Sequence, residues 1–457
     1  MAAARVEQRL IYAPVSQAGI ALAAAGVVGL SLAAAPDIRI AFGLLAFGGL
    51  AALGLTRPAA FIVLFLATRP VLDAWSDQRL VDGVPSANPA GVTAILLIGL
   101  LVIAIAAAPA LPLPRATPAL ALVLAVSAIA AGWALYDLRG AISLEPASEM
   151  VRLTALLAVY VLASHLFKTR RQVERLFIVV GLSGVVPAVL GIVQWVQGPA
   201  VADGLDVGRI DSTFVGPNPF GLYLAMCLLV LIGVGASRVP RVVLLPSLAI
   251  MFIALVGTYS RAGWAMFLIG VVLLEWRRRR ALVVGVAILV TGVVMLVPTV
   301  HDRVLPSKDP GAERAPLESW EWRVQTWRVL IEKGTESPLI GYGLRSTEYV
   351  NPRRMEVLSA PDEGYSAHNI AVKAFVEGGV GLLVAYVVLF GTLFAAAWRL
   401  ARARWPLRRH GAVVLVLWIV GVVVGLSAAD IMGQTSLIFA LFALTGALEG
   451  ARRAGAS

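Results

Sequence analysis

The chain has 457 residues, of which 59% are hydrophobic and only 14% are charged. A soluble domain is nearer half apolar and a quarter charged, so too little polar surface is available here to cover a water-facing globule. The net charge of +11 would suggest nucleic acid in a soluble protein. In a membrane protein the same charge gathers in cytoplasmic loops, so we expect no nucleic-acid partner. The one cysteine, Cys227, excludes an intrachain disulfide.

Apolar stretches of the length that a helix needs to cross a bilayer recur from one end of the chain to the other. We therefore predict an all-α, polytopic helical bundle that forms a single transmembrane domain over 1–457. Arg69 interrupts the third span and the tenth is short, so we expect 12 to 14 transmembrane helices. The predicted spans are 15–34, 39–55, 57–75, 89–108, 118–136, 149–167, 173–195, 217–236, 241–259, 261–276, 281–298, 378–398, 411–428 and 433–449.

The first of these spans ends in "SLAAAP", a run of small residues that is also typical of a signal-peptide cleavage site. Pro36 directly after the possible cleavage point argues against processing, and further spans follow. We therefore expect a retained transmembrane helix.

The basic residues between spans predict the orientation of the bundle. When the spans are threaded alternately, every basic cluster falls on one side, which the positive-inside rule identifies as the cytoplasm. Both termini are then cytoplasmic. The clusters are Arg5 and Arg9, Arg57, Arg115, Lys168 to Arg175, Arg238 and Arg241, Arg277 to Arg280, Arg399 to Arg409, and Arg452 and Arg453.

The outer side carries the longest loop, 299–367. Within it, "LESWEWRVQTWRVLIEKG" places apolar and aromatic residues at helical spacing, which favours a short amphipathic helix on or near the membrane surface. Gly334 and Pro338 are expected to end that helix.

Three outer segments bring polar residues to the edge of apolar runs: Arg209, Arg261 and His368. Each also has an ordinary interpretation. Arg261 can be an interfacial residue that extends to water, Arg209 a loop arginine, and His368 a residue at a helix entry. The "GPNPF" stretch can be a turn into the eighth span. Neither His368 nor the neighbouring Asn369 is needed to begin a helix in lipid.

Together these residues suggest an anion site. Two arginines can hold a diphosphate through charge-assisted bonds, and a histidine with an ordinary pKa near 6.5 can accept a proton from an attacking hydroxyl. Asn369 can orient that histidine or bind the substrate. No metal-ligand pattern is evident, so we expect neither a metal nor a cofactor. His301 is the alternative base, but it follows a span end without a partner motif and is expected to be a surface residue.

Four stretches within 209–384 resemble the O-antigen ligase and O-antigen polymerase superfamily of bacterial membrane glycosyltransferases. In order they are "RIDSTFVGPNPFGLYLAM", "GTYSRAGWAMFLIG", "RVQTWRVLIEKGTESPLIGYGL" and "AHNIAVKAFVEGGVGLL". They match the family's arginine and Pro-Asn segment, its Ser-Arg helix start, its Arg-x-x-x-Trp helix with Pro-Leu-x-Gly-x-Gly, and its His-Asn helix. The sequence departs at Val372 and Lys373, where Leu-Gln is usual, and at Ser212, where glycine is common. A lysine at 373 can alter contacts to the acceptor.

The resemblance implies an inverting, metal-independent transferase in the bacterial inner membrane, with its active site facing outward. It would move a glycan from an undecaprenyl-diphosphate carrier to the hydroxyl of a glycan or lipid A-core acceptor. Arg209 and Arg261 match the family arginines that hold the diphosphate, and His368 matches the histidine that acts on the acceptor. The supporting residues Asn369, Asn218, Arg323 and Ser260 lie in the same motifs.

Three alternatives stay open at this point. Within the family, a polymerase joins repeat units and a ligase transfers a finished glycan, and the sequence does not separate them. Outside it, a transporter or flippase of polysaccharide or lipid-linked sugar has many spans, but transporters usually show two related halves, and no such repeat is evident. A non-catalytic membrane scaffold is the third.

Overall fold

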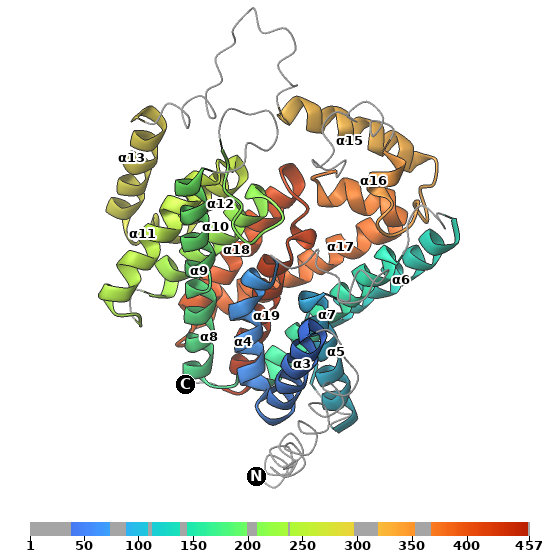
Figure 1. The fold of residues 1–457 in the computed structure, drawn as a ribbon, viewed down its shortest axis with the longest axis horizontal. Helices are drawn as coiled ribbons and strands as arrows, with labels where there is room; N and C mark the ends of the chain where they lie inside the picture. Colours follow the sequence, from blue (N-terminus) through green and yellow to red (C-terminus); the bar gives the residue numbers. More distant parts are fainter. Residues whose placement is uncertain are drawn as a thin grey trace, which may run out of the picture.

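The computed structural model describes residues 38–73, 88–107, 112–137, 144–198, 208–235, 238–296, 319–351 and 367–455. Within these ranges the chain forms helices and no strand, which confirms the all-α prediction (Figure 1). The elements are α3 (Ile38–Thr56), α4 (Pro58–Leu72), α5 (Pro89–Ala107), α6 (Thr117–Asp137), α7 (Glu145–Leu166), α8 (Arg170–Leu182), α9 (Val185–Gln197), α10 (Pro217–Val234), α11 (Arg241–Gly257), α12 (Arg261–Glu275), α13 (Arg280–Leu296), α15 (Ser319–Thr335), α16 (Thr347–Val350), α17 (Ile370–Arg402), α18 (Arg408–Ser427), η4 (Ile431–Gly433) and α19 (Thr435–Arg453).

The described helices follow most of the predicted spans to within a few residues. Seven helical segments are long and apolar enough to cross a membrane when α8 and α9 are counted as one, and four shorter apolar helices accompany them in the described part of the chain. The chain is therefore a polytopic helical bundle. Two spans differ from the prediction: 173–195 is divided into α8 and α9 at Ser183 and Gly184, and α17 begins at Ile370 rather than at 378. The predicted first span, 15–34, lies outside the described residues.

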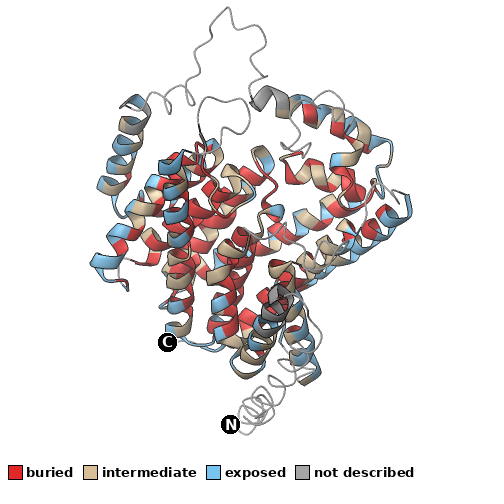
Figure 2. Ribbon diagram, in the orientation of Figure 1, coloured by how far each residue is buried: buried red, intermediate tan, exposed pale blue. Residues whose placement is uncertain are grey.

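The core of the bundle surrounds α10 and α19, which are buried along most of their length (Figure 2). Apolar side chains pack around them; the T-shaped contact of Trp418 with Phe442 is one example. Peripheral helices instead expose large apolar side chains, such as Ile288 on α13 and Val102 on α5. An exposed apolar exterior of this kind suits a lipid environment rather than water.

Several of the basic residues that the sequence assigned to one side meet at one end of the bundle. Arg453, the last residue of α19, donates to the backbone oxygen of Ser164 at the end of α7, at 3.4 Å. Arg452 donates to Arg399 O, near the end of α17, at 3.0 Å. Arg409 donates to backbone oxygens at the ends of α10 and α12, at 3.0 Å each. These contacts place the ends of α7, α10, α12, α17 and α19 together at one end of the bundle.

Helix α17 has a kink at Gly378 and Gly379, where the backbone leaves helical geometry. Gly379 has φ +61°, in the left-handed region that favours glycine. A Cβ at Gly379 would lie 2.5 Å from the backbone oxygens of Pro338 and Leu339, so the approach of that loop also requires glycine. The predicted span began at this kink, because the apolar run alone does not mark the eight-residue segment before it.

The loop that begins at Pro338 supplies the hydrogen bonds that the kinked helix lacks. A break in a helix leaves carbonyl and N–H groups without their usual partners, and these groups must be satisfied elsewhere when buried. Three backbone bonds do so: Tyr342 N–H to Val376 O at 2.8 Å, Gly343 N–H to Glu377 O at 2.9 Å, and Val380 N–H to Pro338 O at 2.8 Å. The Pro-Leu-x-Gly-x-Gly and Glu-x-Gly segments are therefore two halves of one structural unit.

Candidate active site

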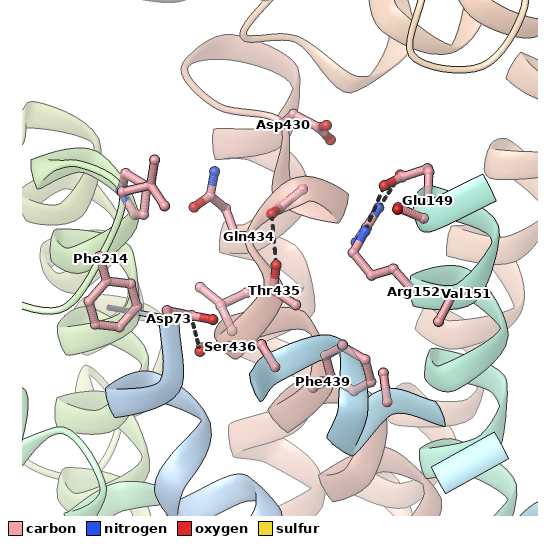
Figure 3. A pocket seen from close by; sticks show the side chains of 18 of the residues that line it. Asp73, Glu149, Val151, Arg152, Phe214, Asp430, Gln434, Thr435, Ser436 and Phe439 are labelled. Carbon is pink, nitrogen blue, oxygen red and sulfur yellow. Dashed lines mark hydrogen bonds and ion pairs between the residues drawn. The ribbon is translucent and has the colours of Figure 1, made fainter. Parts of the chain in front are cut away.

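A cavity of about 800 Å³ opens at the end of the bundle opposite the basic contacts (Figure 3). It is formed where α4 ends and where α5, α7, α10, α17 and α19 begin. Figure 3 shows Phe214 on one side and Glu149 and Arg152 on the other, with the segment from Asp430 to Ser436 between them. The polar lining residues are Arg69, Asp73, Asn88, Glu145, Ser148, Glu149, Arg152, Arg345, Glu348, His368, Lys373, Asp430, Gln434, Thr435 and Ser436.

The charges of this cavity are almost all paired. The lining has four cations and five carboxylates, and four ion pairs join them, so it presents many hydrogen-bonding groups without an excess of positive charge. The pairs are Arg69 with Asp73 (Nε–Oδ1 3.3 Å), Lys373 with Asp430 (Nζ–Oδ2 2.7 Å), Arg345 with Glu145 (Nε–Oε2 3.9 Å), and Arg152 with Glu149. Asp73 also accepts a 2.5 Å bond from Ser436.

His368 lines this cavity from the start of α17. Helix α15 braces the segment, because Trp327 Nε1–H donates to the oxygen of Ala367 at 2.6 Å. Burial lowers the pKa of His368 to about 4; the positive charge of Arg323 acts in the same direction and Asp430 opposes it. The ring is therefore neutral at neutral pH and able to accept a proton, and its pKa lies below the ordinary 6.5 used in the sequence analysis.

Asn369 has a structural role that the sequence analysis did not assign to it. Its Oδ1 caps α17 by accepting from the N–H groups of Ala371 at 2.9 Å and Val372 at 3.2 Å. Its Nδ2 donates to Leu426 O at 2.7 Å. The prediction that Asn369 is not needed to begin the helix was therefore wrong, because the helix starts beside a polar cavity where its first N–H groups need a partner.

Arg209, Asn218 and Ser260 come together at a second location, next to the cavity wall. Arg209 donates from Nη2 to Asn218 Oδ1 and from Nε to Thr258 O, both at 3.2 Å. Ser260 donates to the same Asn218 oxygen at 3.0 Å and caps α12, whose first residue is the exposed Arg261. Neither arginine lines the 800 Å³ cavity itself. Phe214 and Val215 line it from the segment between Arg209 and α10, and Pro219 lines it from the first turn of α10.

A close crossing of α10 and α12 produces this second cluster. A Cβ on Gly263 would lie 2.8 Å from the backbone of Gly221, so the two helices approach as only glycine allows. Their N-termini therefore lie side by side, with Arg209 and Arg261 next to them. Helix N-termini and guanidinium groups both favour negative charge, so the cluster is suited to an anion such as phosphate.

Backbone strain is concentrated in these same segments. In the part of the chain that the structure describes, four non-glycine residues have positive φ: Ser212 (57°), Tyr259 (47°), Arg345 (66°) and His368 (45°). Two line the cavity, and the other two lie in the loops that carry Arg209 and Ser260. Such conformations cost of order 1–3 kcal/mol each and are held by their surroundings, typically at functional sites.

Most of the cavity's charged residues were not predicted from the sequence. Arg152 and Glu149, Arg69 and Asp73, and Asp430 lie within or beside apolar runs, and none was selected. A signal was present, because opposite charges three or four residues apart at the edge of a predicted span indicate a pair held inside the bundle. Lys373, noted only as a departure from the family pattern, lines the cavity and pairs with Asp430.

Two other expectations concern residues elsewhere. The alternative base His301 lies outside the described residues. In the ranges that are described, no group of three His, Cys, Asp or Glu side chains could hold a metal ion.

A helical bundle with apolar spans and a polar cavity at one end defines a multi-pass membrane protein. Residues 246–387 match the family model described as O-antigen ligase. The match covers just under a third of the chain and three of the four quoted segments, and it confirms the resemblance to the O-antigen ligase superfamily. The match supports a membrane protein with a glycan-transferring role in surface polysaccharide assembly. No curated protein matches the chain significantly.

Proposed function

We propose that the protein is a metal-independent, inverting glycosyltransferase of the O-antigen ligase type. It transfers a glycan from an undecaprenyl-diphosphate carrier to an acceptor hydroxyl at the outer face of the bacterial inner membrane. The observation that carries this proposal is His368, a neutral histidine in a strained backbone conformation on the wall of a polar cavity, within the segment that matches the family.

The reaction that fits these residues is a direct displacement. The acceptor hydroxyl attacks the anomeric carbon of the donor sugar, and its proton passes to the neutral ring of His368. The new glycosidic C–O bond forms as the C–O bond to phosphate breaks. The electron pair of the broken bond leaves with undecaprenyl diphosphate, and attack from the opposite face inverts the configuration. Arg209 and Arg261 stabilise the charge that grows on the leaving group.

The two polar locations suggest how donor and acceptor are divided. The Arg209 cluster combines guanidinium groups with two helix N-termini, which favours the diphosphate. The larger cavity has paired charges and many hydrogen-bond acceptors, which favours sugar hydroxyls. We therefore assign the diphosphate to the first location and the sugars to the second. Lys373 and Asp430 would then contact the glycan rather than the carrier.

Reconstitution with a defined polyprenyl-diphosphate glycan tests this function. The purified protein in liposomes, with a chelator present and without ATP or an ion gradient, should release the free carrier diphosphate in amounts equal to the transferred glycan. A second carrier-linked glycan and lipid A-core, offered separately as acceptors, distinguish a polymerase from a ligase. Movement of intact lipid-linked glycan across the bilayer without cleavage would favour the transporter alternative and contradict the proposal.

A further inference from the structure

A second, smaller cavity lies at the basic end of the bundle, far along α17 and α19 from the candidate active site. Its volume is about 360 Å³, and it is formed by the segment before α6 and the final turns of α17 and α19. Four arginines line it: Arg115, Arg399, Arg452 and Arg453. The proposed reaction uses none of them.

The only carboxylate in this cavity already has partners. Glu449 Oε2 accepts from the backbone N–H of Arg115 at 2.9 Å, and Oε1 accepts from the hydroxyl of Tyr160 at 3.1 Å. No ion pair among the described residues joins any of the four arginines to a carboxylate. Four positive charges against one negative charge leave an excess of three around the cavity.

Two of the four arginines are held in place although their charges are not neutralised. Arg453 Nη1 donates to Pro112 O at 2.7 Å, and Arg452 Nη1 donates to Arg399 O at 3.0 Å. A simpler role, compensation of the helix dipoles, accounts for basic residues in the last turns of α17 and α19. It does not account for Arg115, which precedes a helix and faces the same cavity from a third segment.

Apolar and aromatic neighbours place this cavity at the level of the membrane interface. Leu113 lines it and is 53% exposed, which offers an apolar contact beside the four charges. On the same turn of α17, Trp398 is exposed and Arg402 lies 3.9 Å over its ring. Tryptophan with arginine at the end of a transmembrane helix is typical of the headgroup region. A ligand here would meet arginines at one end and lipid tails at the other.

The geometry points to a binding site for the phosphate of an anionic phospholipid, held among α6, α17 and α19 in the leaflet at the basic end. Basic pockets between transmembrane helices suit such headgroups. The guanidinium groups bind the phosphate oxygens, and Leu113 contacts the glycerol and acyl region. The lipid joins three helices at the end of the bundle that lacks the active-site cavity.

Lipid binding to the full-length protein, counted by native mass spectrometry, tests this site. Phosphatidylglycerol is compared with phosphatidylcholine, and inorganic phosphate is offered in a separate arm. The variant R115Q/R399Q removes two charges, and neither side chain makes a hydrogen bond with another described residue. The loss of about 1 kcal/mol per arginine predicts roughly fivefold weaker binding for each charge and about thirtyfold for both. The matched control R277Q/R278Q removes two exposed arginines at the same end but outside the cavity.

We expect tight phosphatidylglycerol binding in the wild type and in R277Q/R278Q, and a loss in R115Q/R399Q, with folding checked by thermal unfolding without lipid. Equal binding in both double variants would overturn the site. Equal binding of phosphatidylcholine would do the same. Occupancy by inorganic phosphate that blocks lipid binding would overturn the assignment to a lipid.

Discussion

His368 shows how several motifs serve one side chain. The Arg-x-x-x-Trp helix supplies Trp327, which holds the oxygen of Ala367, and Arg323, which helps to keep the ring neutral. Asn369 begins the helix directly after it. The sequence predicted that these residues act at one site. Their separate roles depend on the fold, because the side-chain amide of Asn369 forms hydrogen bonds with backbone groups.

Replacement of His368 by alanine is expected to lower transfer by at least about a hundredfold, the lower end of what general-base help provides. Donor binding should change much less, because the proposed diphosphate contacts lie at Arg209 and Arg261. Steady-state transfer and carrier-glycan binding, measured on the same folded preparation, check both parts. Near-normal transfer in His368→Ala would return this residue to the role of a helix entry.

The pH dependence gives an independent test of the same ring. The pKa of His368 is lowered to about 4, so the neutral, proton-accepting form persists as pH falls below neutrality. The wild-type rate should stay level down to about pH 5 and then fall as the ring becomes protonated. Arg323→Gln removes a positive charge that lowers this pKa, so its acid limb should move toward higher pH. An unchanged acid limb in that variant would contradict the assignment.

Replacement of Arg209 or Arg261 by alanine should lower transfer by about a hundredfold or more, the usual effect of removing a charge-stabilising donor. Arg209→Lys and Arg261→Lys should recover only part of the activity, because an ammonium cannot reproduce a planar two-point contact. Arg278→Ala, an exposed arginine at the basic end, is the matched control. Wild-type turnover in Arg261→Ala would favour the interfacial interpretation of that residue.

At the scale of elements, the kink in α17 is the feature that positions His368. The loop that begins at Pro338 forms hydrogen bonds with the backbone groups that lose their helical partners at the kink. The short segment before the kink can therefore turn toward the cavity while the rest of α17 crosses the bundle. The direction of the proposed catalytic residue therefore depends on Gly379, eleven residues further along the chain.

Gly379→Ala is expected to destabilise the protein by at least about 1–3 kcal/mol, because alanine is strained at positive φ and its Cβ would overlap the loop. A lower midpoint of thermal unfolding, with a proportionate loss of transfer, would show it. Gly391→Ala in the same helix is the control, since a Cβ there meets nothing within 4 Å. Equal midpoints for the two variants would mean that the kink does not depend on Gly379.

The existence of most helices could be predicted from the sequence, and their irregularities could not. An apolar run long enough to span a bilayer needs a helix because its backbone must bond internally, so α5, α6 and α18 were placed closely. The break between α8 and α9 and the kink of α17 depend on tertiary contacts that leave no mark on apolar composition. The motif residues of the candidate site could be predicted from the sequence. The pair of Lys373 with Asp430 could not, because it joins two segments that are far apart in the chain.

At the scale of the whole molecule, the two ends differ in kind, with basic contacts at one and a polar cavity at the other. We predict that the basic end is cytoplasmic and that α15 is outside. In a background without Cys227, Glu332→Cys should react with an impermeant thiol reagent applied to spheroplasts, and Arg278→Cys should react only after permeabilisation. Both positions are exposed. The reverse pattern would overturn the orientation and the proposed outward-facing site.

The cavity draws its walls from almost the entire chain. Of its lining, only Arg345, Glu348, His368 and Lys373 come from the segment that matches the family model. The other walls are contributed by helices outside the matched segment, from α4 to α19. Substitutions in those helices can reshape the space offered to a sugar while the proposed base stays in place. An exchange of α4, α5 or α7 between two such proteins is therefore a route to a new glycan preference that leaves every recognisable motif intact.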